Sequence, residues 1–128
     1  KNIQDMIHLA RGNGIKVAIF LQPVLGVGEK IPVGYEKQWI ELNQSEISYR
    51  KLFYERARLM VKNISHSFEP KTEICVDDLS RAVKHEKVRV YTDSGHFNSR
   101  GNSVVAESMI SSLLECSMFK DNGSLPKK

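Results

Sequence analysis

The sequence predicts an α/β layered fold, on three observations. A helical pattern opens the chain and stops at a glycine-containing turn, and the apolar stretch Ile15–Leu21 follows at once. Such a stretch, rich in β-branched residues and almost wholly apolar, is typical of a strand that is covered on both faces. Amphipathic helical patterns and further short extended stretches come downstream, and helices combined with buried strands form layered α/β folds.

The opening helix is predicted from apolar residues at helical spacing and ends at Gly12-Asn13-Gly14, because glycine tolerates the left-handed conformation that terminates helices. After the strand, residues 22–34 form a long loop, since prolines and glycines interrupt every periodic pattern there. Gly26-Val27-Gly28 lacks the third glycine and the helix start of a nucleotide-binding motif. This loop is expected to be either a flexible connection or a lid over a neighbouring site. The apolar positions of the opening helix are Ile3, Met6, Ile7 and Ala10.

A long amphipathic helix comes next. Asn43 and Glu46 have the spacing of a capping box, and the pattern continues for about 18 residues. One stripe is apolar while basic and acidic residues occupy the other faces, so the stripe is expected to face the core. Its residues are Tyr49, Phe53, Ala57, Met60 and Ile64.

The second half of the chain alternates short elements. After a polar turn through Pro70, Glu73–Asp77 is predicted to be a strand, Asp78 to cap a short helix over 79–83, and Val88–Tyr91 to be extended. Asn98 or Ser99 is predicted to cap a final helix. The buried side of that helix is expected to be formed by Val105, Ala106, Met109, Ile110 and Leu113.

Composition indicates one globular domain. The chain has 128 residues and a formal charge of +4, but Lys and Arg are interleaved with Glu, which argues against nucleic-acid binding. No stretch reaches the roughly 18 to 20 apolar residues of a membrane span. Cys75 and Cys116 are expected to be reduced thiols, without a disulfide framework or a zinc site. We assign 1–118 to the domain and 119–128 to a polar tail that is frayed from Asp121 on.

Asp93 and His96 are the residues that point to chemistry. A carboxylate that accepts a hydrogen bond from one ring nitrogen fixes the tautomer and direction of an imidazole, which can then act as a general base. Three residues is a spacing at which a turn brings the two side chains together. Two other interpretations remain open: Asp93 serves only its own turn, or Asp93, His85 and His96 bind a metal, although no second ligand pair has suitable spacing.

The stretch YTDSGHFNSRGNSVVAESMISSLL resembles the carboxyl-terminal block of the SGNH (GDSL-type) hydrolases, in which a D-x-x-H motif precedes the last helix. Asp93, His96, Asn98 and Gly101 match that block position by position. ICVDDLSRAV is similar to the strand before it, and LARGNGIKVAIFLQPV to an earlier helix, strand and loop. The part from Lys30 to Pro70 is the least diagnostic.

This resemblance implies a three-layer, doubly wound, flavodoxin-like fold, present here as an incomplete carboxyl-terminal half with two or three short parallel strands. It implies that His96 activates a serine and Asp93 orients His96, for acyl transfer from a small-molecule or carbohydrate ester without a cofactor. Gln22, Pro23 and Asn98 are weaker candidates for substrate contacts. The chain has neither a G-D-S segment for the nucleophile nor a G-x-N-D block for the oxyanion.

Ser94 is a poor substitute for the nucleophile, because it lies inside the same turn as His96. We therefore expect an amino-terminal segment or a second chain to supply the serine and to pair with the strand Val17–Leu21. A non-catalytic α/β binding or assembly module is the alternative. A third interpretation, binding of an acidic partner, would use Arg50, Lys51, Arg56 and Arg58.

Overall fold

The computed structural model describes residues 2–68 and 73–119 and confirms the mixed α/β class. Within these residues the strands β1 and β2 form a two-stranded parallel sheet, in register from Val17 opposite Ile74 to Leu21 opposite Asp78. The elements in chain order are α1 (Asn2–Gly12), β1 (Val17–Leu21), α2 (Tyr35–Leu42), α3 (Gln44–Ser67), β2 (Ile74–Asp78) and α4 (Ser99–Glu115).

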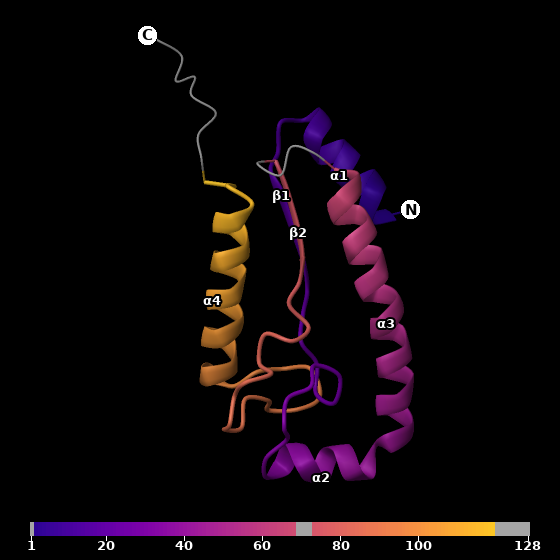
Figure 1. Ribbon diagram of the computed structural model, residues 1–128, viewed down its shortest axis with the longest axis vertical. Coiled ribbons are helices and arrows are strands. Elements are labelled where there is room, and N and C mark those ends of the chain that lie inside the picture. Colours follow the sequence, from indigo (N-terminus) through magenta and orange to yellow (C-terminus); the bar gives the residue numbers. More distant parts are fainter. Residues whose placement is uncertain (1, 69–72, 120–128) are drawn as a thin grey trace.

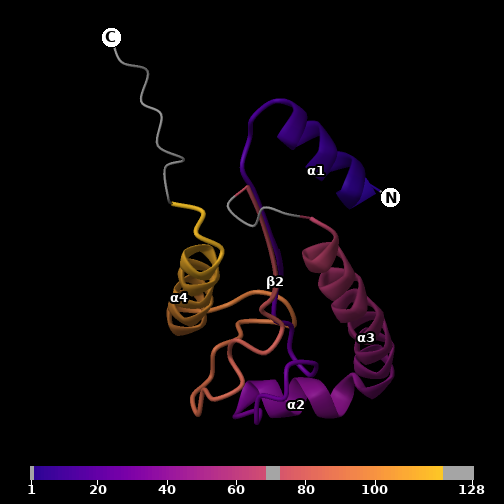
Figure 2. The same cartoon turned by 45° about the horizontal axis from the view of Figure 1, so that its top comes forward.

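The helices surround the strand pair. α3 and α4 lie on opposite sides of β1 and β2, and α1 lies near the beginning of both strands (Figures 1 and 2). α2 crosses the other end, where the strands finish and where the loops over 22–34 and 79–98 gather (Figure 1). Open α/β sheets bind their ligands outside this carboxyl edge. No helix of the described residues is long and apolar enough to cross a membrane.

Two apolar clusters hold this arrangement. The first joins α1, α3 and the strands, and the second lies beneath the loops at the carboxyl edge. The loops at that edge therefore have a core of their own. The buried residues of the first cluster are Ile7, Ile64, Phe68, Ile74 and Val76. Those of the second are Leu25, Val83, Val90 and Tyr91, with Trp39, Ile40, Phe97, Val104 and Val105 packed against them.

β1 is a strand as predicted, but the prediction that both its faces are covered is wrong. Ala18 is exposed and the rest of β1 is half-buried, whereas Ile74 to Val76 of β2 are buried. α3 and α4 pack more closely on β2 than on β1, which accounts for the difference. Within the described residues β1 pairs with β2 along one edge and leaves its other edge open. Val17 N–H donates to Glu73 O at 2.8 Å. Successive N–H groups along a strand point to opposite edges. Since the Val17 N–H points to β2, the N–H groups of Ala18 and Phe20 point to the open edge.

The predicted helical stripes are only partly buried. Ala57 and Ile64 of α3 are buried as expected, and Val105 and Leu113 of α4 are half-buried. The two strands of the described residues form a sheet that is too narrow to cover the whole apolar stripe of each helix, so the remaining stripe residues stay exposed. These exposed residues are Tyr49, Phe53, Met60, Ala106, Met109 and Ile110.

Helix boundaries differ from the sequence prediction in the middle of the chain. α2 was not predicted, and α3 has 24 residues. The expected capping box at Asn43 does not form, because its side chain donates to Trp39 O of α2 at 2.7 Å instead. Asn43 therefore stands at the junction of α2 and α3, and it starts α3 through its carbonyl oxygen, which accepts the Ile47 N–H, rather than through its side chain.

The predicted short helix over 79–83 is a series of turns, although the Asp78 carboxylate accepts the Ser80 N–H at 2.9 Å as a cap would. Val88–Tyr91 forms no strand, and the described structure shows only an isolated antiparallel bridge between Tyr91 and Phe97 there. Pro70 and the tail from Asp121 on lie outside the described residues.

The prediction of two free thiols is wrong. Cys75 and Cys116 form a disulfide with a Cα–Cα distance of 5.7 Å across 41 residues of sequence. The fold brings the end of α4 over buried β2, a proximity that two isolated cysteines in a sequence do not reveal. Closing a loop of this length stabilises a fold by on the order of 4 kcal/mol in the chain-entropy model.

Candidate functional site

Asp93 and His96 lie in a closed turn at the carboxyl edge of the sheet. The arms of the turn meet in the bridge between Tyr91 and Phe97, and Thr92 N–H donates to His96 O at 2.9 Å. The two aromatic rings also pack together, with centroids 5.1 Å apart. Residues 93–96 are thus the tip of a turn whose base is fixed by backbone pairing and by the second apolar cluster.

The structure brings the two predicted residues together. His96 Nδ1 lies 2.8 Å from Asp93 Oδ2, while Asp93 Oδ1 accepts the N–H groups of Gly95 at 2.8 Å and His96 at 2.9 Å. These two backbone bonds, followed by the bond to the His96 ring, lower the pKa of Asp93 to about 2. The carboxylate is therefore charged at neutral pH and holds the ring by Nδ1.

The opposite ring nitrogen, Nε2, is available for chemistry. A neutral ring whose Nδ1–H donates to a carboxylate has a lone pair on Nε2, which is the form a general base requires. The His96 side chain is 83% exposed, so the ring can be reached from outside the chain. The pair can accept a proton and stabilise the imidazolium that results.

Ser94 is hydrogen-bonded to Arg50 and Leu25 and not to the His96 ring. Its Oγ accepts from Arg50 Nη2 at 3.0 Å, and its carbonyl oxygen accepts from Arg50 Nη1 at 3.2 Å and from Leu25 N–H at 3.0 Å. The Arg50 guanidinium also lies 5.2 Å from the centroid of the Trp39 ring. In the described residues no serine hydroxyl is hydrogen-bonded to the His96 ring. Ser94 anchors the tip of the turn to α3 and to the loop over 22–34.

The weaker candidates Gln22 and Pro23 lie in that same loop. Gln22 is exposed, and its carbonyl oxygen accepts the Tyr54 hydroxyl at 2.9 Å. Pro23 is buried. The bond between Leu25 N–H and Ser94 O places this loop beside the turn. That Gln22 and Pro23 contact a substrate stays a prediction.

Asn98 and Gly101 shape the other side of the turn. Asn98 Oδ1 accepts from Gly101 N–H at 3.0 Å as the predicted helix cap, and Asn98 Nδ2 donates to Arg89 O at 2.7 Å. Both ends of the Asn98 amide are thus engaged within the chain. A Cβ atom at residue 101 would lie 2.6 Å from Val90 O, so only glycine lets α4 begin this close to the turn.

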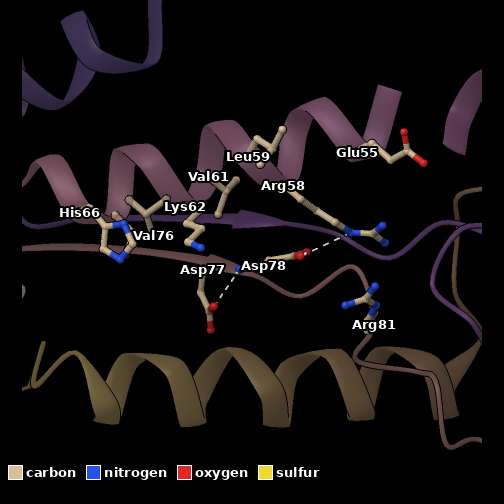
Figure 3. Close-up of a pocket in the computed structure, with 11 residues that line it drawn as sticks. Glu55, Arg58, Leu59, Val61, Lys62, His66, Val76, Asp77, Asp78 and Arg81 are labelled. Atoms are coloured by element: carbon tan, nitrogen blue, oxygen red, sulfur yellow. Dashed lines mark hydrogen bonds and ion pairs between the residues drawn. The ribbon is translucent and has the colours of Figure 1, made fainter. Parts of the chain in front are cut away.

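A groove of about 680 Å³ lies between α3 and β2, apart from the Asp93–His96 turn (Figure 3). Basic side chains from α3 and carboxylates from β2 line it, and Arg58 Nε lies 3.5 Å from Asp78 Oδ2. Asp93 and His96 are not among its lining residues. No group of three His, Cys, Asp or Glu side chains suited to a metal ion occurs in residues 2–68 and 73–119.

The four basic residues suggested for an acidic partner do not form one free surface. Arg50 is bound to Ser94 and Glu46, and Arg58 to Ser80 and Asp78. Lys51 and Arg56 are exposed. Binding of an acidic partner stays a prediction.

The sequence did not predict two contacts to the turn, those made by Arg50 and Glu36. Arg50 acts across 44 residues of sequence, and Glu36 Oε1 accepts Val90 N–H across 54. Glu36 lies in the helix that was not predicted. A local sequence pattern cannot predict contacts of this kind, because the residues that make them come together only in the folded chain.

Comparison of the chain with protein-family models, with curated protein sequences and with solved structures gave no match. The functional proposal therefore rests on the geometry of Asp93 and His96 and on the sequence motif that contains them.

The low pKa of Asp93 predicts how the turn responds to acid. Because the pKa of the folded form is about 2, below the ordinary 3.8, the stabilisation from this carboxylate is present above about pH 3.8 and is lost as the pH falls through 2. The ¹³C resonance of the Asp93 carboxyl should titrate near pH 2. In a His96→Ala control it should stay below 3.8, because the two backbone bonds remain. A wild-type midpoint at the ordinary value would show that the turn is not formed.

Proposed function

We propose that this chain supplies the Asp/His part of a serine ester hydrolase of the SGNH type. The observation that carries the proposal is the 2.8 Å contact between His96 Nδ1 and a carboxylate that is itself fixed by two backbone N–H groups. This leaves Nε2 exposed as the base. The resemblance of residues 91–114 to the D-x-x-H block of that family supports the same assignment.

The proposed reaction is acyl transfer in two steps. His96 Nε2 takes the proton of a serine hydroxyl as the serine oxygen attacks the ester carbonyl carbon, and Asp93 stabilises the imidazolium. The tetrahedral intermediate collapses to an acyl-enzyme, and the imidazolium returns its proton to the departing alcohol. Water then attacks the acyl-enzyme with His96 as base again, which releases the acid and restores the serine. This chain contributes the proton carrier and the residue that orients it.

The fold is consistent with the three-layer, doubly wound arrangement that the resemblance implies. Helices α3 and α4 lie on opposite sides of a parallel sheet, and the Asp93–His96 turn lies beyond its carboxyl edge (Figure 1). The sheet is narrower than such a fold requires. We therefore include in the proposal a further segment that widens it.

The edges of the two strands differ in a way that favours addition at β1. On β2, the Asp77 carboxylate accepts the Asp78 N–H at 2.8 Å, and charged side chains at an edge oppose further strand pairing. β1 has the apolar sequence VAIFL, with no proline or charge. We propose that the segment that carries the serine, either preceding Lys1 or from a second chain, pairs with β1. The substrate class is a small-molecule or carbohydrate ester.

The hydrolase proposal is tested by substitution of His96 in the complete protein. His96→Ala should lower hydrolysis of a chromogenic acetyl ester by roughly 10³- to 10⁶-fold, because the base is lost. Asp93→Asn should cost on the order of 10⁴-fold, because the ring tautomer is lost. His85→Ala is the matched control: His85 is exposed and should change neither hydrolysis nor stability.

Wild-type hydrolysis in the His96→Ala variant would contradict the proposal. The alternative, a non-catalytic α/β binding or assembly module, would then account for the chain. Its binding would depend on the loop over 22–34 or on the exposed side of α3.

Pairing at β1 predicts a change in amide exchange. In the 128-residue chain alone, the amides of Ala18 and Phe20 should exchange rapidly, and in the complete protein they should slow at least about 100-fold. Val17 is the internal control, because its N–H already donates to Glu73 O. A monodisperse complete protein in which Ala18 and Phe20 still exchange rapidly would count against pairing at this edge.

A further inference from the structure

A buried carboxylate lies behind the Asp93–His96 turn. The Glu36 side chain is 0% exposed and accepts four hydrogen bonds. Oε2 accepts from Lys30 Nζ at 2.6 Å and Val33 N–H at 3.1 Å, whereas Oε1 accepts from the N–H groups of Val90 at 2.8 Å and Tyr91 at 3.1 Å. Each carboxylate oxygen thus accepts hydrogen bonds from a different segment of the chain.

The two segments are the ones that form the candidate site. Lys30 and Val33 belong to the loop over 22–34, and Val90 and Tyr91 form the arm of the turn that leads directly to Asp93. One carboxylate therefore fixes the base of the turn and the loop against each other. At the tip, the Leu25 N–H bond to Ser94 O holds the same two segments together, and Arg50 attaches Ser94 to α3.

The donors around Glu36 keep its carboxylate ionised although it is buried. Burial alone would raise the pKa of Glu36, but the bonds from Lys30 and from the three backbone N–H groups outweigh it, so the pKa is lowered. Glu36 is therefore an anion at neutral pH. Without it, the Val90 and Tyr91 N–H groups would be buried with no acceptor, a cost that folded chains avoid.

We propose that Glu36 is a positioning residue for the Asp93–His96 pair, holding the arm of the turn so that the His96 ring meets Asp93 through Nδ1. The inference rests on the proposed function in that the oriented ring is the base of the hydrolase. Glu36 acts through the backbone of Val90 and Tyr91 and does not touch the substrate.

Glu36→Gln tests this role because glutamine has nearly the same shape but only one acceptor oxygen. Its NH₂ group must face donors, either Val90 and Tyr91 or Lys30 and Val33. We expect the amide of Thr92, which closes the turn onto His96 O, to exchange at least about tenfold faster. We expect the ¹⁵N shifts of the neutral His96 ring to move from the Nδ1–H tautomer toward a mixture of tautomers.

Ile64→Ala is the matched control. Ile64 belongs to the first apolar cluster, so its truncation destabilises the fold without contacting the turn. The control should leave the His96 tautomer unchanged. If the ring and the Thr92 amide in Glu36→Gln respond no more than in Ile64→Ala, Glu36 is a general structural residue and the proposal is overturned.

A second variant covers the case in which Glu36→Gln does not fold. Glu36→Asp keeps the charge but is one methylene shorter, so it cannot reach both segments at once. It should shift the ring tautomer in the same direction by a smaller amount. Wild-type ring shifts and Thr92 exchange in folded Glu36→Asp would also overturn the proposal.

These readouts need neither substrate nor nucleophile, which separates them from the hydrolase proposal. In a complete protein that hydrolyses a chromogenic acetyl ester, Glu36→Gln should lower kcat at least about tenfold and leave KM nearly unchanged. If the wild-type protein hydrolyses no ester but the His96 ring still responds to Glu36→Gln, the hydrolase proposal fails and the positioning role is supported.

Discussion

The buried Glu36 carboxylate is the interaction on which the arrangement of the candidate site depends. It accepts from Lys30 and Val33 of one segment and from Val90 and Tyr91 of another, and these segments form the loop and the turn at the carboxyl edge of the sheet. A buried carboxylate is stable only with such a set of donors. Because the donors are mostly backbone N–H groups, the interaction fixes where the chain runs as well as which side chains meet.

The width of the sheet is the second constraint. In the part of the chain that the structure describes, two strands leave one edge of β1 open and leave apolar side chains of α3 and α4 exposed. The Cys75–Cys116 disulfide compensates in part, since it attaches the end of α4 to β2, and neither apolar cluster described above includes a residue from that end of α4. A disulfide persists in oxidising surroundings, so the stability of this half of the fold depends on redox conditions. The same narrowness favours a further strand beside β1.

Short-range features could be predicted from the sequence because their physical cause is short-range. The carboxylate of Asp93 reaches the ring of His96 within one turn, Asn98 caps the helix that it precedes, and Val17–Leu21 is apolar enough to form a strand. Long-range contacts could not be predicted. The disulfide spans 41 residues, and Glu36 reaches Val90 across 54, so neither leaves a local pattern. Burial of the helical stripes was overestimated because a pattern shows which side is apolar and not whether a partner covers it.

Peptide mapping of the protein from its natural source after treatment with a fluorophosphonate tests the central claim most directly. The proposed division of the site, with the base and its carboxylate in this chain and the nucleophile elsewhere, predicts an adduct on a serine outside the 128 residues. It also predicts that the adduct disappears when His96 is replaced by Ala. A protein of these 128 residues alone that takes up no label would contradict the account, and the Asp93–His96 turn would then belong to a binding or assembly module.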